Sequence, residues 1–273
     1  MMLRGASTAI NPFPKNRMIR KTRNLRENVD SLTSLPICLM PVYLLNEQII
    51  FPPAQFARED GLLAVGGDLS QDRLLLAYRQ GIFPWFMDAE PILWWSPDPR
   101  LVLYPAEFRP SRSLQKKIRQ NMFRVTADQA FSQVITACAQ IRRDNDERTW
   151  IGADMISAYC RLYESGFAHS VEAWYEDKLA GGIYGVSLGR CFFGESMFTL
   201  IRDASKVALA ALVSHLRENA FDFIDCQITT SHLVRLGARE MPRTLFLKQL
   251  AKALEAPTTT GQWTMGMELR NAD

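Results

Sequence analysis

Apolar positions in the first half of the chain recur mainly at helical spacing. Residues 68–81 predict a helix, because Leu74, Leu75 and Tyr78 fall on one face and Gly81 suits the position after a helix end. The remaining helices expected from the same pattern begin at Ser111, begin near Phe131 after a capping box at Thr126 and Gln129, and cover 153–165, 204–219, 231–236 and 244–254.

From His169 onward the apolar period changes to two, which is typical of β-strands. Short polar turns separate three expected strands over 170–176, 179–189 and 190–198. A fourth strand, 221–228, follows a helix and can lie beside the third. This order is similar to that of acetyltransferases. The sequence therefore predicts an α+β protein, with a small N-terminal mixed α/β domain and a C-terminal acetyltransferase-like (GNAT-type) domain.

The charge distribution sets the N-terminal segment apart. Residues 1–39 hold seven basic and two acidic side chains, whereas the whole chain has a net charge of +3. We expect this polar segment not to fold, and it is either an unstructured extension, a nucleic-acid-binding arm, or a stretch upstream of a true start at Met40. The expected organisation is a leader over 1–39, a small domain over 40–110, a catalytic domain over 111–255 and a tail over 256–273.

Composition excludes several classes of protein. The chain is 47% apolar over 273 residues, which is enough to bury a full core. Its five cysteines have no CxxC spacing and its three histidines form no HExxH motif, so neither a disulfide framework nor a metal site is expected. The chain has no run of about 20 apolar residues, the length that a transmembrane helix needs. We therefore expect a cytoplasmic protein without a metal and without membrane contact.

The strand over 190–198 contains an unexpected acidic residue. Glu195 stands among phenylalanines and a methionine, and a buried carboxylate without a partner costs several kcal/mol. Either Lys206 or Arg202 neutralises it, or it faces a site that receives a cation from outside.

Two familiar catalytic patterns can be set aside. The GVSLG segment at 185–189 matches a hydrolase nucleophile motif, with Asp225 and His232 following in the right order. That motif needs a strand that turns sharply into a helix, whereas here another strand follows. An acetyl-CoA site usually has glycines before its helix, and 199–206 contains none. If the fold is acetyltransferase-like, the donor is a different molecule.

Asp225 and Gln227 end an otherwise apolar strand. Strand alternation predicts that both face one side and Cys226 the other. An acid beside an amide can form a hydrogen-bonded relay in which the carboxylate orients the amide. Two polar residues at a solvated strand end are the simpler explanation, but the apolar residues before them favour a site.

Eight ordered segments resemble one known family, the leucyl/phenylalanyl-tRNA-protein transferases. The resemblance covers about 51–250 and implies transfer of Leu or Phe, and also Met, from charged tRNA to proteins that begin with Arg or Lys, which marks them for degradation. It implies no cofactor, since the charged tRNA is a substrate, and we expect a monomer. The matching segments are GLLAVGGDLS, GIFPWF, ILWWSPDPR, GGIYGVSLG, GESMF, ASKVAL, IDCQI and LGARE followed by MPR.

The resemblance also implies roles for individual residues. Glu195 would line the place where the acceptor's N-terminus arrives, and Tyr78, Trp85 and Trp150 would hold the 3′-terminal adenosine. Departures from the family pattern leave the fine substrate preference open; they are Arg148, Thr199, Val207 and Arg235.

The reaction itself suggests further candidates. Aminolysis of an ester needs positioning more than a strong base, so we expect Gln227, aligned by Asp225, to accept a hydrogen bond from the attacking amine. Candidates for an apolar aminoacyl pocket are Phe192, Met197 and Leu209, and candidates for tRNA backbone contacts are Arg112, Lys116 and Arg119, which share one helix face. Two alternatives remain open at this point: an aminoacyl-tRNA-dependent peptidyl transferase of cell-wall synthesis, and a non-catalytic reader of tRNA or N-termini.

Overall fold

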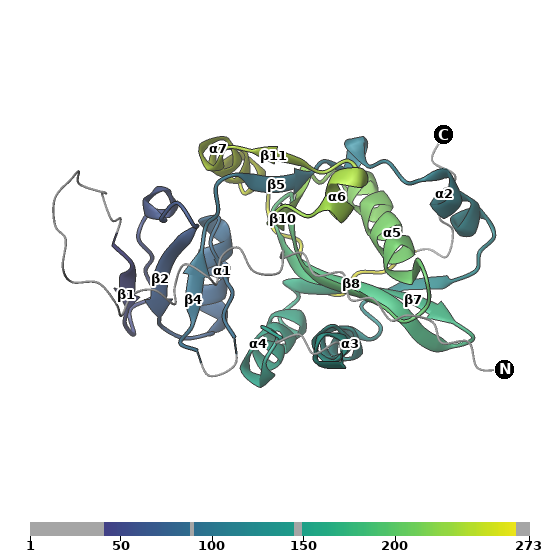
Figure 1. Ribbon diagram of the computed structural model, residues 1–273, viewed down its shortest axis with the longest axis horizontal. Coiled ribbons are helices and arrows are strands. Elements are labelled where there is room, and N and C mark those ends of the chain that lie inside the picture. Colours follow the sequence, from purple (N-terminus) through teal and green to yellow (C-terminus); the bar gives the residue numbers. More distant parts are fainter. Residues whose placement is uncertain (1–40, 88–89, 145–148, 266–273) are drawn as a thin grey trace, which may run out of the picture.

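A computed structural model describes residues 41–87, 90–144 and 149–265 (Figure 1). Its strands form two sheets, one of four strands and one of seven. The predicted leader over 1–39 lies outside the described residues.

The smaller sheet comes from the N-terminal part of the chain. Its strand order is β1-β2-β4-β3, and β1 runs parallel to β2. Helix α1 packs beside this sheet and matches the helix expected over 68–81, with Gly81 at φ 71° just after it. The elements are β1 (Tyr43–Leu45), a 3-10 turn (Ala54–Phe56), β2 (Leu62–Gly66), α1 (Gln71–Arg79), β3 (Phe83–Pro84) and β4 (Leu93–Trp95).

The larger sheet has the order β11-β5-β10-β9-β8-β7-β6. Its strands are β5 (Arg100–Leu103), β6 (Arg124–Ala127), β7 (Ala168–Tyr175), β8 (Lys178–Leu188), β9 (Cys191–Thr199), β10 (Phe223–Gln227) and β11 (Arg239–Met241). The three strands expected after His169 are β7, β8 and β9, and β10 lies beside β9 in parallel, so these predictions are confirmed.

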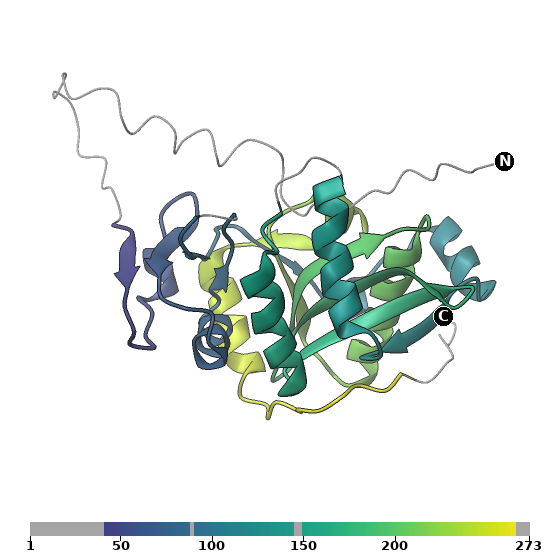
Figure 2. The ribbon, with the colours of Figure 1, turned by 90° about the horizontal axis from the view of Figure 1, so that it is seen from below.

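Helices cover both faces of the larger sheet (Figures 1 and 2). On one face lie α3 (Phe131–Asp144) and α4 (Ala153–Glu164), and on the other lies α5 (Ala204–Glu218). Each face buries its own apolar cluster, and the cluster under α3 and α4 continues into the residues between α1 and the smaller sheet. The remaining helical elements are a 3-10 turn (Pro105–Glu107), α2 (Arg112–Arg119), α6 (Ser231–Arg235) and α7 (Arg243–Ala253).

Two expectations about organisation are wrong. The boundary between the parts does not fall at 110, because β5 pairs with β10 and β11 inside the larger sheet. Thr126 does not cap a helix: it lies in β6, where its hydroxyl donates to Glu172, and α3 begins five residues later at Phe131. A short strand between polar turns gives too few alternating positions to be recognised.

The C-terminal segment packs against the larger sheet up to residue 265. Figure 2 shows it (yellow) running along the body of the protein. The Trp263 ring stacks on His169 with ring centroids 3.9 Å apart, and its backbone N–H donates to Asp128 at 2.7 Å. Within the described residues, the segment expected as a tail is therefore part of the folded structure.

Candidate functional site

A bulge in β9 places Glu195. Gly185 of β8 pairs with Gly194 and the neighbouring Tyr184 pairs with Ser196, so Glu195 is an extra residue without a partner in the ladder. The two strands approach closely here: a Cβ added to Gly185 would clash with the carbonyl oxygen of Phe193. The glycines allow the bulge, and the bulge turns a carboxylate out of the alternation of the strand.

Three side chains donate hydrogen bonds to the Glu195 carboxylate, which is 3% exposed. Oε1 accepts from the Tyr78 hydroxyl at 2.8 Å and from the Gln227 amide at 2.9 Å. Oε2 accepts from the Tyr159 hydroxyl at 3.0 Å. The two tyrosine hydroxyls also lie within hydrogen-bonding distance of each other. Residues from α1, α4 and β10 thus converge on one acid of β9.

This environment shifts the pKa values of its members. Burial raises the pKa of Glu195 to about 7, although the hydrogen bonds from Tyr78, Tyr159 and Gln227 each favour the ionised form. Burial, with the charge of Glu195 nearby, raises the pKa values of both tyrosines well above their ordinary range. The tyrosines therefore stay protonated and act as donors, while Glu195 changes its charge near neutral pH.

The two basic residues expected to neutralise Glu195 pair with a different acid, Asp203. Lys206 pairs with Asp203 at 2.8 Å, and the nearest charge contact of Arg202 is also Asp203, at 3.7 Å. None of the ion pairs among the described residues includes Glu195. Neutralisation of Glu195 by Lys206 or Arg202 is thus wrong.

Asp225 has a buried cation of its own. The Arg100 guanidinium on β5 donates from Nε to Oδ1 at 2.8 Å and from Nη2 to Oδ2 at 2.7 Å, and both residues are 0% exposed. The guanidinium also lies over the rings of Phe83, 4.9 Å from the centroid, and of Phe246, 4.5 Å from the centroid. Because Arg100 binds both of its oxygens, the carboxylate of Asp225 is an anchor of the strand end.

The expectation that the Asp225 carboxylate orients the Gln227 side-chain amide is therefore wrong. The strand register shifts between these residues, and Gln227 adopts a φ of 62°. Asp225 Oδ1 accepts from the backbone N–H of Gln227 at 2.9 Å, whereas the side-chain amide donates to Glu195. Asp225 fixes the backbone turn at Gln227, and Glu195 holds its amide.

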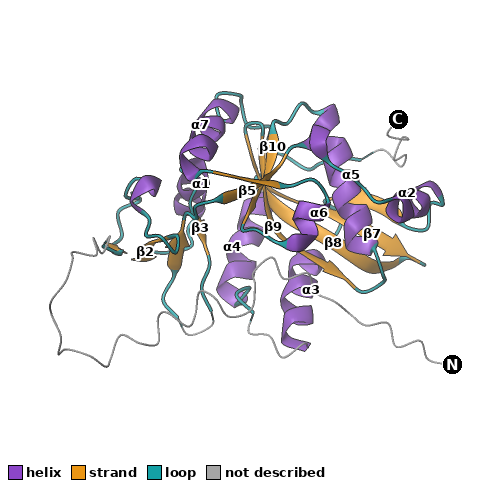
Figure 3. Cartoon of the chain, turned by 45° about the horizontal axis from the view of Figure 1, so that its top comes forward, coloured by secondary structure: helices purple, strands orange, loops and turns teal. Residues whose placement is uncertain are grey.

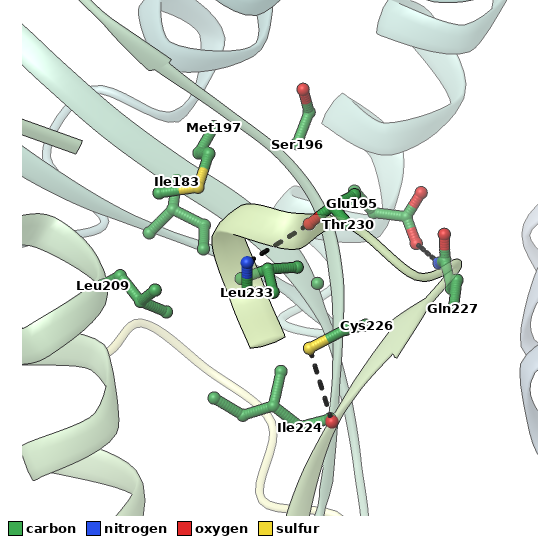
Figure 4. Close-up of a pocket in the computed structure, with 11 residues that line it drawn as sticks. Ile183, Glu195, Ser196, Met197, Leu209, Ile224, Cys226, Gln227, Thr230 and Leu233 are labelled. Atoms are coloured by element: carbon green, nitrogen blue, oxygen red, sulfur yellow. Dashed lines mark hydrogen bonds between the residues drawn. The ribbon is translucent and has the colours of Figure 1, made fainter. Parts of the chain in front are cut away.

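An apolar cavity opens beside Glu195 and Gln227 (Figure 4). It lies past the point where pairing of β9 with β10 ends, at Phe193 and Asp225. Figure 3 shows β9 and β10 side by side, with α5 and α6 nearby. The lining residues are Ile183, Gly194, Glu195, Ser196, Met197, Leu209, Ile224, Cys226, Gln227, Thr230 and Leu233.

The three pocket candidates are placed differently. Met197 and Leu209 line the cavity, as the sequence suggested. Phe192 does not: it lies before the bulge, is 1% exposed and packs against Trp263 with ring centroids 5.7 Å apart. Phe192 therefore belongs to the core beneath α5, which corrects the expectation that it lines the pocket.

The aromatic candidates do not form an open platform. Tyr78 is 0% exposed and packs on Phe193 with ring centroids 4.9 Å apart, so no base can stack on its ring in this structure. Trp150 is 3% exposed. Trp85 is half-buried and packs against Trp95, with ring centroids 5.4 Å apart. The role of Tyr78 here is to donate to Glu195.

The three basic candidates lie on α2, and all are exposed. The neighbouring Lys117 instead pairs with Asp203 at 2.6 Å, which ties α2 to the start of α5. In Figure 1, α2 lies at the opposite end of the larger sheet from α1.

Sequence reasoning missed two residues of this site. Tyr159 occupies an apolar position of an amphipathic helix, where the pattern indicates an ordinary core residue. Arg100 ends the ILWWSPDPR segment, and a buried arginine after two prolines was a possible signal of an ion pair, but its partner is 125 residues away.

No cluster of three metal-binding side chains occurs in the part of the chain that the structure describes. Nor is any helix in that part both long and apolar enough to span a membrane.

Comparison with known proteins identifies the family. Residues 102–251 match the model of leucyl/phenylalanyl-tRNA protein transferase, and residues 67–98 match that of its N-terminal domain. The leucyl/phenylalanyl-tRNA–protein transferase of Desulfatibacillum aliphaticivorans is 58% identical over 84% of this chain and 98% of its own. The transferase of Syntrophobacter fumaroxidans is 58% identical over 82% of this chain and 96% of its own.

Similarity to solved structures is weaker. The C-terminal domain of a candidate lysylphosphatidylglycerol synthetase from Agrobacterium fabrum aligns over 63% of this chain and 56% of its own, at 11% identity and a TM-score of 0.36. A similarity this weak does not assign the chain to a fold family. The sequence relatives decide the question: the chain belongs to the leucyl/phenylalanyl-tRNA protein transferase family and is an aminoacyltransferase.

Proposed function

We propose that this enzyme transfers Leu, Phe and also Met from aminoacyl-tRNA to the N-terminal α-amine of proteins that begin with Arg or Lys, and so marks them for degradation. The supporting observation is the buried carboxylate of Glu195 beside an apolar cavity, in contact with Gln227. We also propose a cytoplasmic monomer without a cofactor. An acetyltransferase-like (GNAT-type) larger sheet is supported by the parallel pair β9 and β10, whose pairing stops at the site.

The chemistry needs little from the protein beyond positioning. The acceptor α-amine has a pKa of about 7.7–8.0, so roughly a tenth of it is neutral at pH 7. The amine nitrogen attacks the ester carbonyl carbon, a tetrahedral intermediate forms, and the bond to the ribose oxygen breaks. The amine loses one proton and the ribose oxygen gains one. In this proposal the amide oxygen of Gln227 accepts a hydrogen bond from the attacking amine and aligns it.

The apolar cavity suits the aminoacyl side chain. Met197 and Leu209 line it together with other apolar residues, and Glu195 and Gln227 are among its polar lining residues. A hydrophobic pocket separates substrates that differ by a methylene by only about 1–3 kcal/mol. Acceptance of Leu, Phe and Met by one pocket follows from this weak discrimination.

Glu195 has room for one further donor. A carboxylate offers about four acceptor positions, and three are occupied by Tyr78, Tyr159 and Gln227. The remaining position on Oε2 can accept from the ammonium or guanidinium group of an N-terminal Lys or Arg. An ionised carboxylate at this place favours a cationic side chain over a neutral or acidic one.

Replacing Glu195 with glutamine should reduce this selectivity. We expect the preference for an Arg-led over an Ala-led peptide to fall by roughly tenfold or more, because a hydrogen bond to a charged group contributes about 1.5–3 kcal/mol. The measurement is the ratio of kcat/KM values for Arg-, Lys- and Ala-led peptides, since overall rates also fall when the contact with Gln227 changes. Glu164→Gln, an exposed change on α4, is the control. An unchanged ratio would remove Glu195 from acceptor recognition.

The exposed basic face of α2 is proposed to contact the tRNA backbone. Arg112→Glu, Lys116→Glu and Arg119→Glu together should weaken binding of charged tRNA and make the dependence of log Kd on log salt shallower by about two to three. The same reversal at the exposed Lys178 and Lys252 is the control. A salt titration by filter binding that gives equal slopes for wild type and the α2 variant would show a merely solvated face.

In the same way, Trp85 and Trp150 stay predicted contacts of the 3′-terminal adenosine. Trp85 keeps some exposed surface, while Trp150 would need to move for a base to reach it.

A further inference from the structure

The amide of Gln227 has two ends, and catalysis can use only one of them. Its Nε2 donates to Glu195 Oε1 at 2.9 Å. The amide oxygen lies on the other arm of the same planar group and is therefore turned away from the carboxylate. An attacking amine needs an acceptor for the hydrogen bond from its N–H, and only the amide oxygen can be that acceptor. The orientation of this amide thus depends on Glu195 remaining an acceptor in a fixed place.

The carboxylate of Glu195 is fixed in turn by two hydroxyls. Tyr159 of α4 binds Oε2, and Tyr78 of α1 binds Oε1. Both tyrosines are 0% exposed, and burial with the nearby charge keeps their pKa values high, so both remain donors across the pH range of the reaction. Because α1 packs with the smaller sheet and α4 with the larger one, both parts of the protein hold this acid.

We propose that Tyr159 is a positioning residue for the transfer: with Tyr78 it keeps Glu195 a carboxylate acceptor, and Glu195 in turn points the Gln227 amide oxygen at the attacking amine. This inference rests on the proposed function and adds residues to its site. In this proposal Tyr159 acts through its hydrogen bond to Glu195.

The proposal has a consequence for pH. A protonated Glu195 carries an O–H, which favours a flipped Gln227 amide whose oxygen faces Glu195 and is lost to the amine. Activity is therefore lost as pH falls through the pKa of Glu195, which stands near 7. The groups that face this carboxyl are Tyr78 on α1, Tyr159 on α4, and Gln227 and Asp225 on β10, with the charge of Asp225 raising the pKa of Glu195 and Arg100 paired to Asp225.

Tyr159→Phe tests this directly. Loss of the hydroxyl removes one interaction that favours ionised Glu195, so the acid limb of the kcat profile should move to higher pH. At pH 7 we expect kcat to fall roughly tenfold, from loss of one hydrogen bond to a charged group, with the KM for Phe-tRNA unchanged. Each rate is divided by the concentration of neutral acceptor amine at that pH. The pH profile then does not include the titration of the amine.

The matched control is Tyr163→Phe, one turn along α4, whose hydroxyl donates to the Asp128 carbonyl at 2.7 Å. It should leave both kcat and the acid limb in place. A Tyr159→Phe variant with wild-type kcat, or with a lowered kcat but an unmoved acid limb, would overturn the positioning role. Should Tyr159→Phe not fold, Tyr78→Phe makes the same test, with the same shift expected. Transfer by the wild-type protein to an Arg-led peptide is measured first. If the wild type shows no transfer, the proposed function fails, and this result is distinct from a failure of the positioning role of Tyr159.

Discussion

Replacing Arg100 with methionine should destabilise the protein by about 3–5 kcal/mol, because the buried Asp225 carboxylate is left without its cation. The guanidinium binds both carboxylate oxygens and packs between Phe83 and Phe246, so the variant loses charge pairing and ring contacts together. The free energy of unfolding from urea titration is the measurement.

Two comparisons make this prediction specific. Arg190 pairs with Asp222 at 3.1 Å on the surface, where both side chains are partly exposed, so Arg190→Met should cost less than about 1 kcal/mol. Adding Asp225→Asn to Arg100→Met removes the unpaired charge and should recover much of the lost stability. Equal losses for Arg100→Met and Arg190→Met would show that the buried pair is not the anchor described above.

Withdrawing the amide of Gln227 from Glu195 should lower the transfer rate by about 10²-fold, which is what misplacing a reacting group by about 1 Å can cost. Gln227 has a φ of 62°, a conformation that strains alanine but that asparagine tolerates. Gln227→Asn is therefore the better variant, since it keeps the backbone turn and withdraws the amide from Glu195. Gln249→Asn, at a residue that accepts from Tyr104, is the control, and steady-state transfer of labelled Phe is the measurement.

Much of the fold followed from the sequence because its strands are long and alternate cleanly. The period of two from His169 onward located β7, β8 and β9, and the turn at Glu176 and Asp177 has two residues with positive φ, as tight hairpins require. β5 was missed because four residues between prolines and a polar turn show no periodicity. β6 was missed because Thr126 also suits a helix cap, and only its partner β7, far along the chain, decides between them.

The site was predicted in part for a physical reason. Polar residues inside apolar strands are costly, so Glu195, Asp225 and Gln227 were recognisable from type and place alone. Their contacts were not, because register shifts at Glu195 and between Asp225 and Gln227 both break the strict alternation on which the prediction rested. Whether Asp225 meets Gln227 or Arg100 depends on pairing between β5 and β10, which no local pattern encodes.

Single-turnover transfer from Phe-tRNA to an Arg-led peptide, compared between wild type and Gln227→Asn at saturating charged tRNA, tests the central claim most directly. Binding of Phe-tRNA is measured in parallel. If the Gln227 amide, held through its Nε2 by Glu195, aligns the amine with its oxygen, tRNA binds equally well to both proteins while the rate constant falls by about 10²-fold. Equal rate constants for the two proteins would contradict a catalytic role for this amide.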